Sequence, residues 1–286
     1  MSAYILFLDK NVNGVINIFS QQILLSVKDV LIYNTMNYCK LLFIIFFFSL
    51  VGFGKDVSAQ SSTYVIVHGA WGGAWQFKNT AVELAKKGNE VYRPTLTGLG
   101  ERYHLADTSI RLQTHVNDVV NTILFEDLHD IILVGHSYGG MVITAVADSL
   151  PDRIRKLVYL DAILPEDQQS VINLMGKSTA ANGLLKLEKD GYIFPFWVKD
   201  VKKLPRDVPH PLKTMTDKIN LKNPKRLKIP STYILTYTDG TAIEEDDFYP
   251  FYKKAKTMGF KTIEFVGDHN PQIKRLKELV DLLEQE

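Results

Sequence analysis

Short apolar runs alternate with stretches of helical periodicity from Thr63 onward, and this alternation limits the possible fold more than any other feature. Most of the runs are apolar throughout, which is typical of strands buried on both faces of a parallel sheet. The runs lie at 64–67, 91–94, 131–134, 157–160, 233–235 and 263–266. Between them, apolar residues recur at helical spacing, as at Val116, Val119 and Ile123. The sequence therefore predicts an α/β fold with a mostly parallel, doubly wound sheet.

Residues 163–228 interrupt this alternation. They contain several prolines, a mixture of aromatic residues and lysines, and no clear strand. We expect them to form a mostly helical cap that lies over the carboxyl ends of the strands. The predicted domain then covers residues 60–286, with the cap at about 163–228.

The amino terminus has the parts of a secretory signal peptide. Lys40 precedes an apolar run at 41–53, and the small-x-small tripeptide Val57-Ser58-Ala59 follows. The run is shorter than the ~20 residues that a membrane-spanning helix needs. We expect cleavage after Ala59 and a mature protein that is secreted or periplasmic, with an uncleaved membrane anchor as the alternative.

Residues 1–35 are long and partly apolar, so they fit poorly as the charged start of a signal peptide. Met36 is a more natural start than Met1. The prediction is that residues 1–59 form a leader and that Gln60 begins the mature chain.

Composition argues against several kinds of partner. The chain has 33 basic and 32 acidic residues, and a net charge of +1 creates no strong field for nucleic acid or an anionic membrane. The single cysteine, Cys39, supports neither a disulfide framework nor a Cys-based metal site. His104, His115 and His129 lack metal-ligand spacing and are interpreted as surface or structural residues. We expect no metal, no cofactor and no membrane association after processing, while the oligomeric state is unknown.

The motif with the clearest chemistry is G-x-S-x-G at 135–139. An apolar run precedes it and a helical pattern follows, so Ser137 would lie on a sharp strand-to-helix turn flanked by glycines. Such a turn projects the hydroxyl above the sheet at a helix amino terminus, where developing negative charge is favoured. Ser137 is therefore the predicted nucleophile.

A serine nucleophile needs a base and an acid that orients the base. His269 follows a predicted strand, whereas His210 lies between two prolines inside the predicted cap, so His269 is the predicted base. Asp239 follows the run at 233–237 directly and is favoured as the acid. Asp161 also ends a predicted strand and remains the rival.

The loop after the first strand, at 68–75, carries several glycines that allow close backbone approach. We expect the backbone N–H groups of Ala70 and Tyr138 to form an oxyanion hole. Trp71, Trp75 and Tyr138 are predicted to line the substrate pocket.

These motifs together resemble the α/β-hydrolase superfamily, and within it the branch of plant salicylate methyl esterases, hydroxynitrile lyases and related bacterial esterases. The resembling stretches lie at 67–75, 96–100, 114–116, 135–142, 159–162, 165–167, 238–239 and 267–269. The resemblance implies an α/β-hydrolase fold over about 63–285, with the acid at Asp239 and the base at His269.

The lyases of that branch have a threonine at the position of Ala70 and a lysine directly after the catalytic histidine, where this chain has Asn270. Without an ammonium group to hold a cyanide leaving group, lyase chemistry loses its electrostatic partner. The sequence therefore favours hydrolysis of small carboxylic esters through an acyl-enzyme. A C–C lyase and a non-hydrolysing small-molecule receptor are the alternatives.

Overall fold

The structure is a computed structural model, and it describes residues 26, 28, 61–175, 183 and 185–286. Contacts divide the chain into two units, Met1–Gln60 and Ser61–Glu286. The predicted leader at 1–59, its cleavage site and the start at Met36 lie outside the described residues, apart from Ser26 and Lys28. No helix in the part of the chain that the structure describes is long and apolar enough to cross a membrane.

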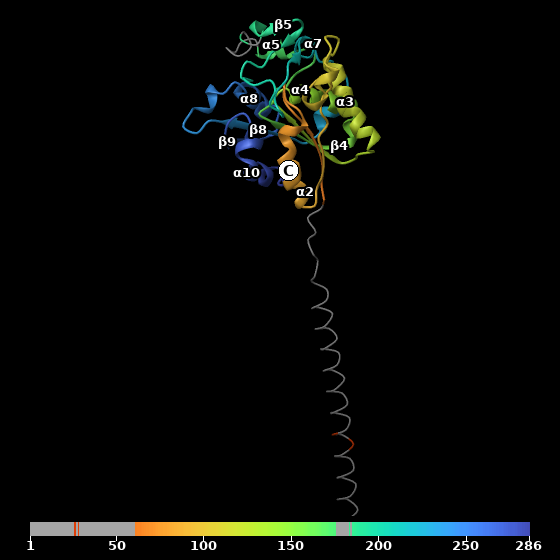
Figure 1. The fold of residues 1–286 in the computed structure, drawn as a ribbon. Helices are drawn as coiled ribbons and strands as arrows, with labels where there is room; N and C mark the ends of the chain where they lie inside the picture. The colour runs from red at the N-terminus through yellow and green to blue at the C-terminus, as the bar shows by residue number, and fades with distance from the viewer. Residues whose placement is uncertain (1–25, 27, 29–60, 176–182, 184) are drawn as a thin grey trace, which may run out of the picture. The chain divides into compact units, whose positions relative to one another are not determined.

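The second unit is built on a six-stranded parallel sheet (Figure 1). Its order is β2-β1-β3-β4-β8-β9. The chain starts at β1, adds β2 on one side, and then adds β3, β4, β8 and β9 in turn on the other side. The strands are β1 (Thr63–Val67), β2 (Glu90–Tyr92), β3 (Ile131–His136), β4 (Ile154–Leu160), β8 (Ser231–Tyr237) and β9 (Lys261–Val266). Every pairing within this sheet is parallel, as the alternation predicts.

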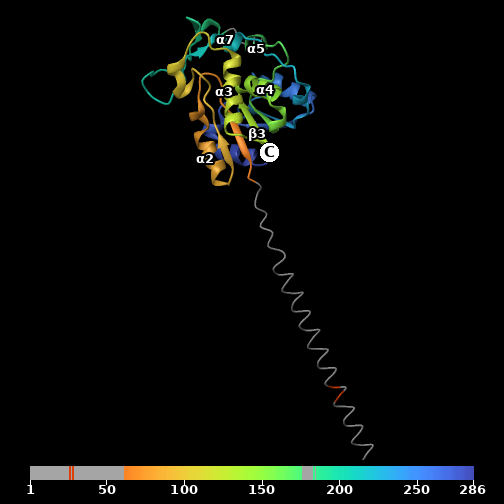
Figure 2. The same ribbon diagram turned by 90° about the vertical axis from the view of Figure 1, so that its right-hand side faces the viewer.

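Helices cover both faces of this sheet, and successive strand residues point to opposite faces. In β1, Tyr64 and Ile66 pack with α2 (Lys78–Lys86) and α10 (Leu276–Leu283). The intervening Val65 and Val67 pack on the other face. That face is covered by α3 (Leu112–Phe125), α4 (Gly139–Ser149) and α8 (Tyr249–Thr257), and α3 lies beside α4 (Figure 2). The predicted doubly wound α/β fold is confirmed.

Short elements complete the domain in the connections between strands and after the last strand. They are η1 (Ala74–Phe77), η2 (Gly100–Leu105), η3 (Pro151–Arg153), η5 (Ile243–Glu245) and α9 (Pro271–Lys274).

The connection between β4 and β8 forms the cap, beyond the carboxyl ends of the strands at the top of Figure 1. It contains α5 (Val171–Met175), β5 (Glu188–Lys189), β6 (Tyr192–Ile193), β7 (His210–Pro211), α7 (Leu212–Thr216) and η4 (Pro224–Lys228). The strands β5, β6 and β7 pair in an antiparallel sheet. The expectation of a mostly helical cap without strands is wrong in this respect, because strands of two residues leave no readable periodicity in the sequence.

Candidate active site

Ser137 lies in the turn between β3 and α4, with a φ of 55° in the left-handed region. The two motif glycines make this turn possible, because the chain passes close to itself there. A Cβ at Gly139 would lie 2.7 Å from the Val67 carbonyl oxygen, and one at Gly135 would lie 2.8 Å from the Gly139 carbonyl oxygen. The predicted strand–turn–helix context of Ser137 is confirmed, and it holds the hydroxyl at the amino terminus of α4.

His269 follows β9 and meets the serine from the other half of the sheet. Its Nε2 accepts a hydrogen bond from Ser137 Oγ at 3.0 Å. Its Nδ1 donates to a carboxylate oxygen of Asp161 at 2.6 Å. The structure thus brings Ser137 and His269 together as expected, although 132 positions separate them in the chain.

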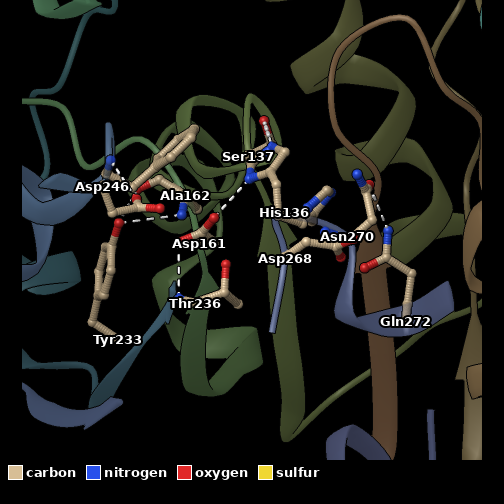
Figure 3. Close-up of polar contacts among 12 residues, drawn as sticks. His136, Ser137, Asp161, Ala162, Tyr233, Thr236, Asp246, Asp268, Asn270 and Gln272 are labelled. Carbon is tan, nitrogen blue, oxygen red and sulfur yellow. Dashed lines mark hydrogen bonds and ion pairs between the residues drawn. The ribbon is translucent and has the colours of Figure 1, made fainter. Parts of the chain in front are cut away.

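Asp161 follows the last residue of β4, and its carboxylate is almost fully buried, with 1% of its side-chain surface exposed. One oxygen accepts the His269 hydrogen bond, and the other accepts the backbone N–H of Thr236 at 3.0 Å (Figure 3). Asp161 has a φ of 45°, so the chain turns sharply as it leaves the sheet. This turn directs the carboxylate toward His269.

The favoured acid, Asp239, does not contact the imidazole, so this part of the prediction is wrong. Asp239 lies in an exposed turn beyond β8, which is closed by a hydrogen bond from the Thr241 N–H to the Thr238 carbonyl. Its side chain makes no hydrogen bond or ion pair with any described residue. The rival, Asp161, occupies the place beside His269 instead.

The charge of Asp161 decides the protonation behaviour of the imidazole. Burial alone would lower the pKa of His269, but the hydrogen bond to Asp161 and its negative charge outweigh burial and raise the pKa above 6.5. The imidazole still has 39% of its side-chain surface exposed, because it faces the pocket. The Asp161 carboxylate therefore stabilises this imidazole when it accepts a proton.

Two further side chains hold His269, and sequence reasoning missed both. His136, inside the G-x-S-x-G motif, donates from Nε2 to the His269 carbonyl oxygen at 2.7 Å. The Phe248 ring stacks on the imidazole with centroids 4.8 Å apart and an interplanar angle of 17°. Because His136 directly precedes Ser137 in the motif, its place near the site could have been predicted from the sequence. Nothing in the sequence indicated that Phe248 would contact His269.

The loop after β1 brings one expected oxyanion donor, Ala70, to the cavity at Ser137, and the other, Tyr138, follows the serine directly. A Cβ at Gly69 would lie 3.0 Å from the Ser137 Cβ, so this loop approaches the nucleophile closely. His68 fixes the loop, because its Nδ1 donates to the Gly69 carbonyl at 2.8 Å and its Nε2 accepts the Leu96 N–H at 3.1 Å. The backbone N–H groups of Ala70 and Tyr138 donate to no described residue. Both are therefore free to bind an oxyanion.

A cavity of about 600 Å³ opens above Ser137, and its walls are predominantly apolar. Trp71 and Tyr138 line it, as predicted. The other lining side chains include Ile163, Val171, Leu187, Phe196, Trp197, Met215 and Phe248. Trp75 lines neither this cavity nor the smaller one described next, because it lies at the start of η1, so its predicted role is corrected.

A second, more polar hollow of about 280 Å³ meets the first at Ser137 and His269. It is lined by Gln76, Asp207 and Asn270, and by Gly69, Ala70 and Trp71 of the loop at 68–75, which we call the oxyanion loop. Asp207 accepts hydrogen bonds from Gln76 Nε2 at 3.3 Å and from Trp197 Nε1 at 2.7 Å. Burial raises the pKa of the Asp207 carboxyl, an effect that the bond from Trp197 opposes. The serine thus faces an apolar space on one side and a polar space on the other.

Within the described residues, no cluster of three or more His, Cys, Asp or Glu side chains could hold a metal ion. The chemistry that the arrangement supports is nucleophilic attack by a serine hydroxyl, with a histidine to accept its proton and backbone donors to bind the resulting oxyanion.

This chain is similar to known esterases and hydrolases. A "Carbendazim hydrolyzing esterase" of Nocardioides sp. (strain SG-4G) is 51% identical over 117 residues, which are 41% of this chain and 48% of the relative. "Methylesterase 2" of Arabidopsis thaliana is 28% identical over 120 residues, 37% of this chain and 41% of the relative. The aligned parts thus span less than half the length of these relatives.

Among solved structures, an extracellular alpha/beta-hydrolase from a Paenibacillus species matches with a TM-score of 0.66 and 28% identity. The match covers 78% of this chain and 97% of that one, and its description reports structural and functional homology to tobacco salicylic acid binding protein 2. The predicted resemblance to the branch of plant methyl esterases and related bacterial esterases is confirmed by these matches. The signature of the alpha/beta hydrolase family matches residues 64–282, and this chain belongs to that family.

Proposed function

We propose that this protein is a serine carboxylic ester hydrolase with Ser137, His269 and Asp161 as its catalytic triad. The observation that carries the proposal is the unbroken hydrogen-bond chain from the Ser137 hydroxyl through the imidazole to the Asp161 carboxylate. The oxyanion loop and the apolar cavity meet at the same hydroxyl.

In the proposed reaction, Ser137 Oγ attacks the ester carbonyl carbon while His269 Nε2 accepts the hydroxyl proton. Asp161 remains ionised and stabilises the imidazolium that forms. The Ala70 and Tyr138 N–H groups bind the negative oxygen of the tetrahedral intermediate. His269 then gives its proton to the leaving alcohol, and an acyl-enzyme on Ser137 remains.

Water completes the proposed cycle. His269 accepts a proton from water, the hydroxide equivalent attacks the acyl carbon, and the carboxylic acid leaves as Ser137 regains its proton. No step requires a metal or cofactor.

The two spaces beside the serine favour small, neutral, partly apolar esters. The predominantly apolar walls of the larger cavity suit an aromatic or aliphatic group, because burying such surface yields ~25 cal/mol per Å². The polar hollow suits the smaller, hydrated part of the ester. Methyl esters and carbendazim, suggested by the relatives' names, are therefore among the first substrates to assay.

The decisive experiment uses the mature chain with p-nitrophenyl acetate. Ser137→Ala should abolish turnover, whereas Ser149→Ala, at the end of the same helix α4, should leave it unchanged. A fluorophosphonate should add covalently to Ser137 in the unaltered protein and not in the Ser137→Ala variant. Undiminished turnover in Ser137→Ala would refute the proposal.

We also propose that the chain is processed after Ala59 and secreted or delivered to the periplasm. The first strand begins at Thr63, so this cleavage leaves the whole sheet intact, and the Paenibacillus relative is described as extracellular. Amino-terminal sequencing of the native protein should find Gln60 first. A mature chain that retains residues before Gln60 would contradict the proposed cleavage, and one that retains residues before Met36 would also contradict a start at Met36.

A further inference from the structure

Trp71 adopts a backbone conformation that is unusual for a bulky residue. Its φ is 62°, and the Gly72 N–H donates to the Ala70 carbonyl across it at 2.7 Å, which makes a tight three-residue turn. A non-glycine residue in this region costs on the order of 1–3 kcal/mol unless its surroundings hold it there. The turn belongs to the oxyanion loop, because its first residue is Ala70.

The N–H, the carbonyl and the indole N–H of Trp71 each form a hydrogen bond with the cap. The Trp71 N–H donates to His210 Nδ1 at 3.2 Å, and its carbonyl accepts the Val208 N–H at 2.8 Å. The indole Nε1 donates to the Ile193 carbonyl at 2.9 Å. All three partners lie in the cap, on β6, on β7 or just before it. The cap ring of Trp197 also packs edge-on against the indole, with centroids 5.1 Å apart.

The hydrogen bonds around His210 are consistent with a single tautomer. Its Nδ1 accepts from Trp71, so the ring proton lies on Nε2, which donates to Thr214 Oγ1 at 2.6 Å. The Thr214 hydroxyl in turn donates to the Pro211 carbonyl at 2.8 Å. Burial, followed by the nearby His115 and His68, lowers the pKa of His210 well below 6.5. His210 is therefore neutral and remains an acceptor.

His210, to which the sequence analysis assigned no role, is a contact between the cap and the Trp71 turn. His210 is fully buried, and the rings of Trp71, Tyr138 and His115 pack around it at centroid distances of 5.0 to 5.9 Å. Its hydrogen bond to the Trp71 N–H fixes the peptide that follows Ala70. The direction of the Ala70 N–H depends on that turn.

We infer that the cap positions the oxyanion hole through Trp71, and that His210 is a positioning residue for the proposed ester hydrolysis. The inference rests on the proposed function. It makes the cap part of the machinery for binding the transition state, in addition to its role as a wall of the pocket. Loss of the His210 acceptor lets the Trp71 turn relax, so the Ala70 donor leaves its place beside Ser137.

The test compares two substitutions at position 210 with a control in the same part of the cap. His210→Ala removes the acceptor, whereas His210→Asn puts a carbonyl oxygen near the place of Nδ1. Thr216→Ala, at the exposed end of α7, is the matched control. Circular dichroism and thermal unfolding establish that each variant is folded.

For p-nitrophenyl acetate, His210→Ala should lower kcat by about 10- to 100-fold while KM changes less than threefold. This loss is smaller than the ~10²–10³ typical of deleting an oxyanion donor, because the donor is misplaced and not removed. His210→Asn should recover most of kcat, and Thr216→Ala should match the unaltered protein. Affinity for a trifluoromethyl ketone, whose carbonyl carbon adds Ser137 Oγ to form an oxyanion, should fall in proportion to kcat.

A purely structural role would give a different pattern. Equal losses of substrate and trifluoromethyl ketone affinity, or no recovery in His210→Asn, would overturn the inference. An unchanged kcat in a folded His210→Ala variant would also overturn it.

A second measurement does not depend on turnover. In the unaltered protein, ¹⁵N spectra should show His210 protonated on Nε2 alone, and the Trp71 amide should exchange slowly with solvent. In His210→Ala that exchange should accelerate at least tenfold, with the amides of β3 unaffected. If the unaltered protein hydrolysed no ester, the proposed function would fail. Rapid exchange of the Trp71 amide, or a proton on His210 Nδ1, would separately refute the role of His210 in holding the Trp71 turn.

Discussion

The carboxyl ends of β4 and β8 look alike in the sequence and differ completely in the structure. The two strands are hydrogen-bonded neighbours, and an aspartate follows each within two residues. Asp161, after β4, is buried and accepts two hydrogen bonds. Asp239, after β8, is exposed and has no side-chain partner among the described residues.

The difference arises from what surrounds each strand end. Asp161 turns at once, and β8 itself supplies the Thr236 N–H that holds its carboxylate. The Tyr233 hydroxyl, also on β8, donates to the Ala162 carbonyl at 2.6 Å and accepts the Ala162 N–H at 3.2 Å. The chain after β8 runs on into an exposed turn. Of these two carboxylates, only Asp161, which buried donors hold, meets the imidazole of His269.

The difference between the two aspartates can be tested by neutralising each carboxylate in turn. Asp161→Asn should lower kcat by about 10⁴-fold, the size seen for this change in other Ser-His-Asp enzymes, because the amide favours the wrong imidazole tautomer. Asp239→Asn should stay within twofold of the unaltered protein. Steady-state kinetics on p-nitrophenyl acetate measure both, and a larger loss in Asp239→Asn would reverse the assignment.

The pH profile separates the two carboxylates in a second way. His269 must be neutral to act as a base, and Asp161 raises its pKa above 6.5. Below that pKa, kcat/KM should fall about tenfold per pH unit. Removing the negative charge disfavours the imidazolium, so the acidic limb of Asp161→Asn should move to lower pH.

Asp239→Asn should leave that limb in place. The measurement is kcat/KM across pH 4 to 9 for all three proteins. A limb that moves in Asp239→Asn and not in Asp161→Asn would contradict the pairing of Asp161 with His269.

The support that β8 gives to the β4 end can be tested at Tyr233. Tyr233→Phe removes the buried hydroxyl and leaves both Ala162 backbone groups without that partner, which should lower the free energy of unfolding by about 1–3 kcal/mol. Tyr237→Phe, at the half-buried end of the same strand, is the control and should cost less than about 0.5 kcal/mol. Urea denaturation measures both, and equal effects would show that the hydroxyl does not stabilise this turn.

The smallest expected effect is at the β8 end itself. Gly240 has a φ of 80°, and a Cβ there would meet no atom within 4 Å. Gly240→Ala should cost about 1 kcal/mol of stability from backbone strain alone and leave kcat unchanged. A tenfold loss of kcat with stability preserved would show that the turn carrying Asp239 takes part in the site.

Much of the site was readable because local patterns and chain order specify it. The glycines around Ser137 are needed where the backbone approaches itself, and an apolar run before them predicts the strand. His269 was identified by its place after the last strand. The cap was harder, because strands of two residues carry no period, and the roles of His210 and Trp71 depend on contacts across more than 120 positions.

Alternation of apolar runs, glycine spacing and strand ends are local properties of the chain, so they were enough to predict the doubly wound sheet, the turn at Ser137 and the place of His269 after the last strand. The choice between Asp161 and Asp239 required the folded structure. Burial and hydrogen-bond donors distinguish the two carboxylates, and for Asp161 those donors come from β8 and from His269, 75 and 108 positions away along the chain.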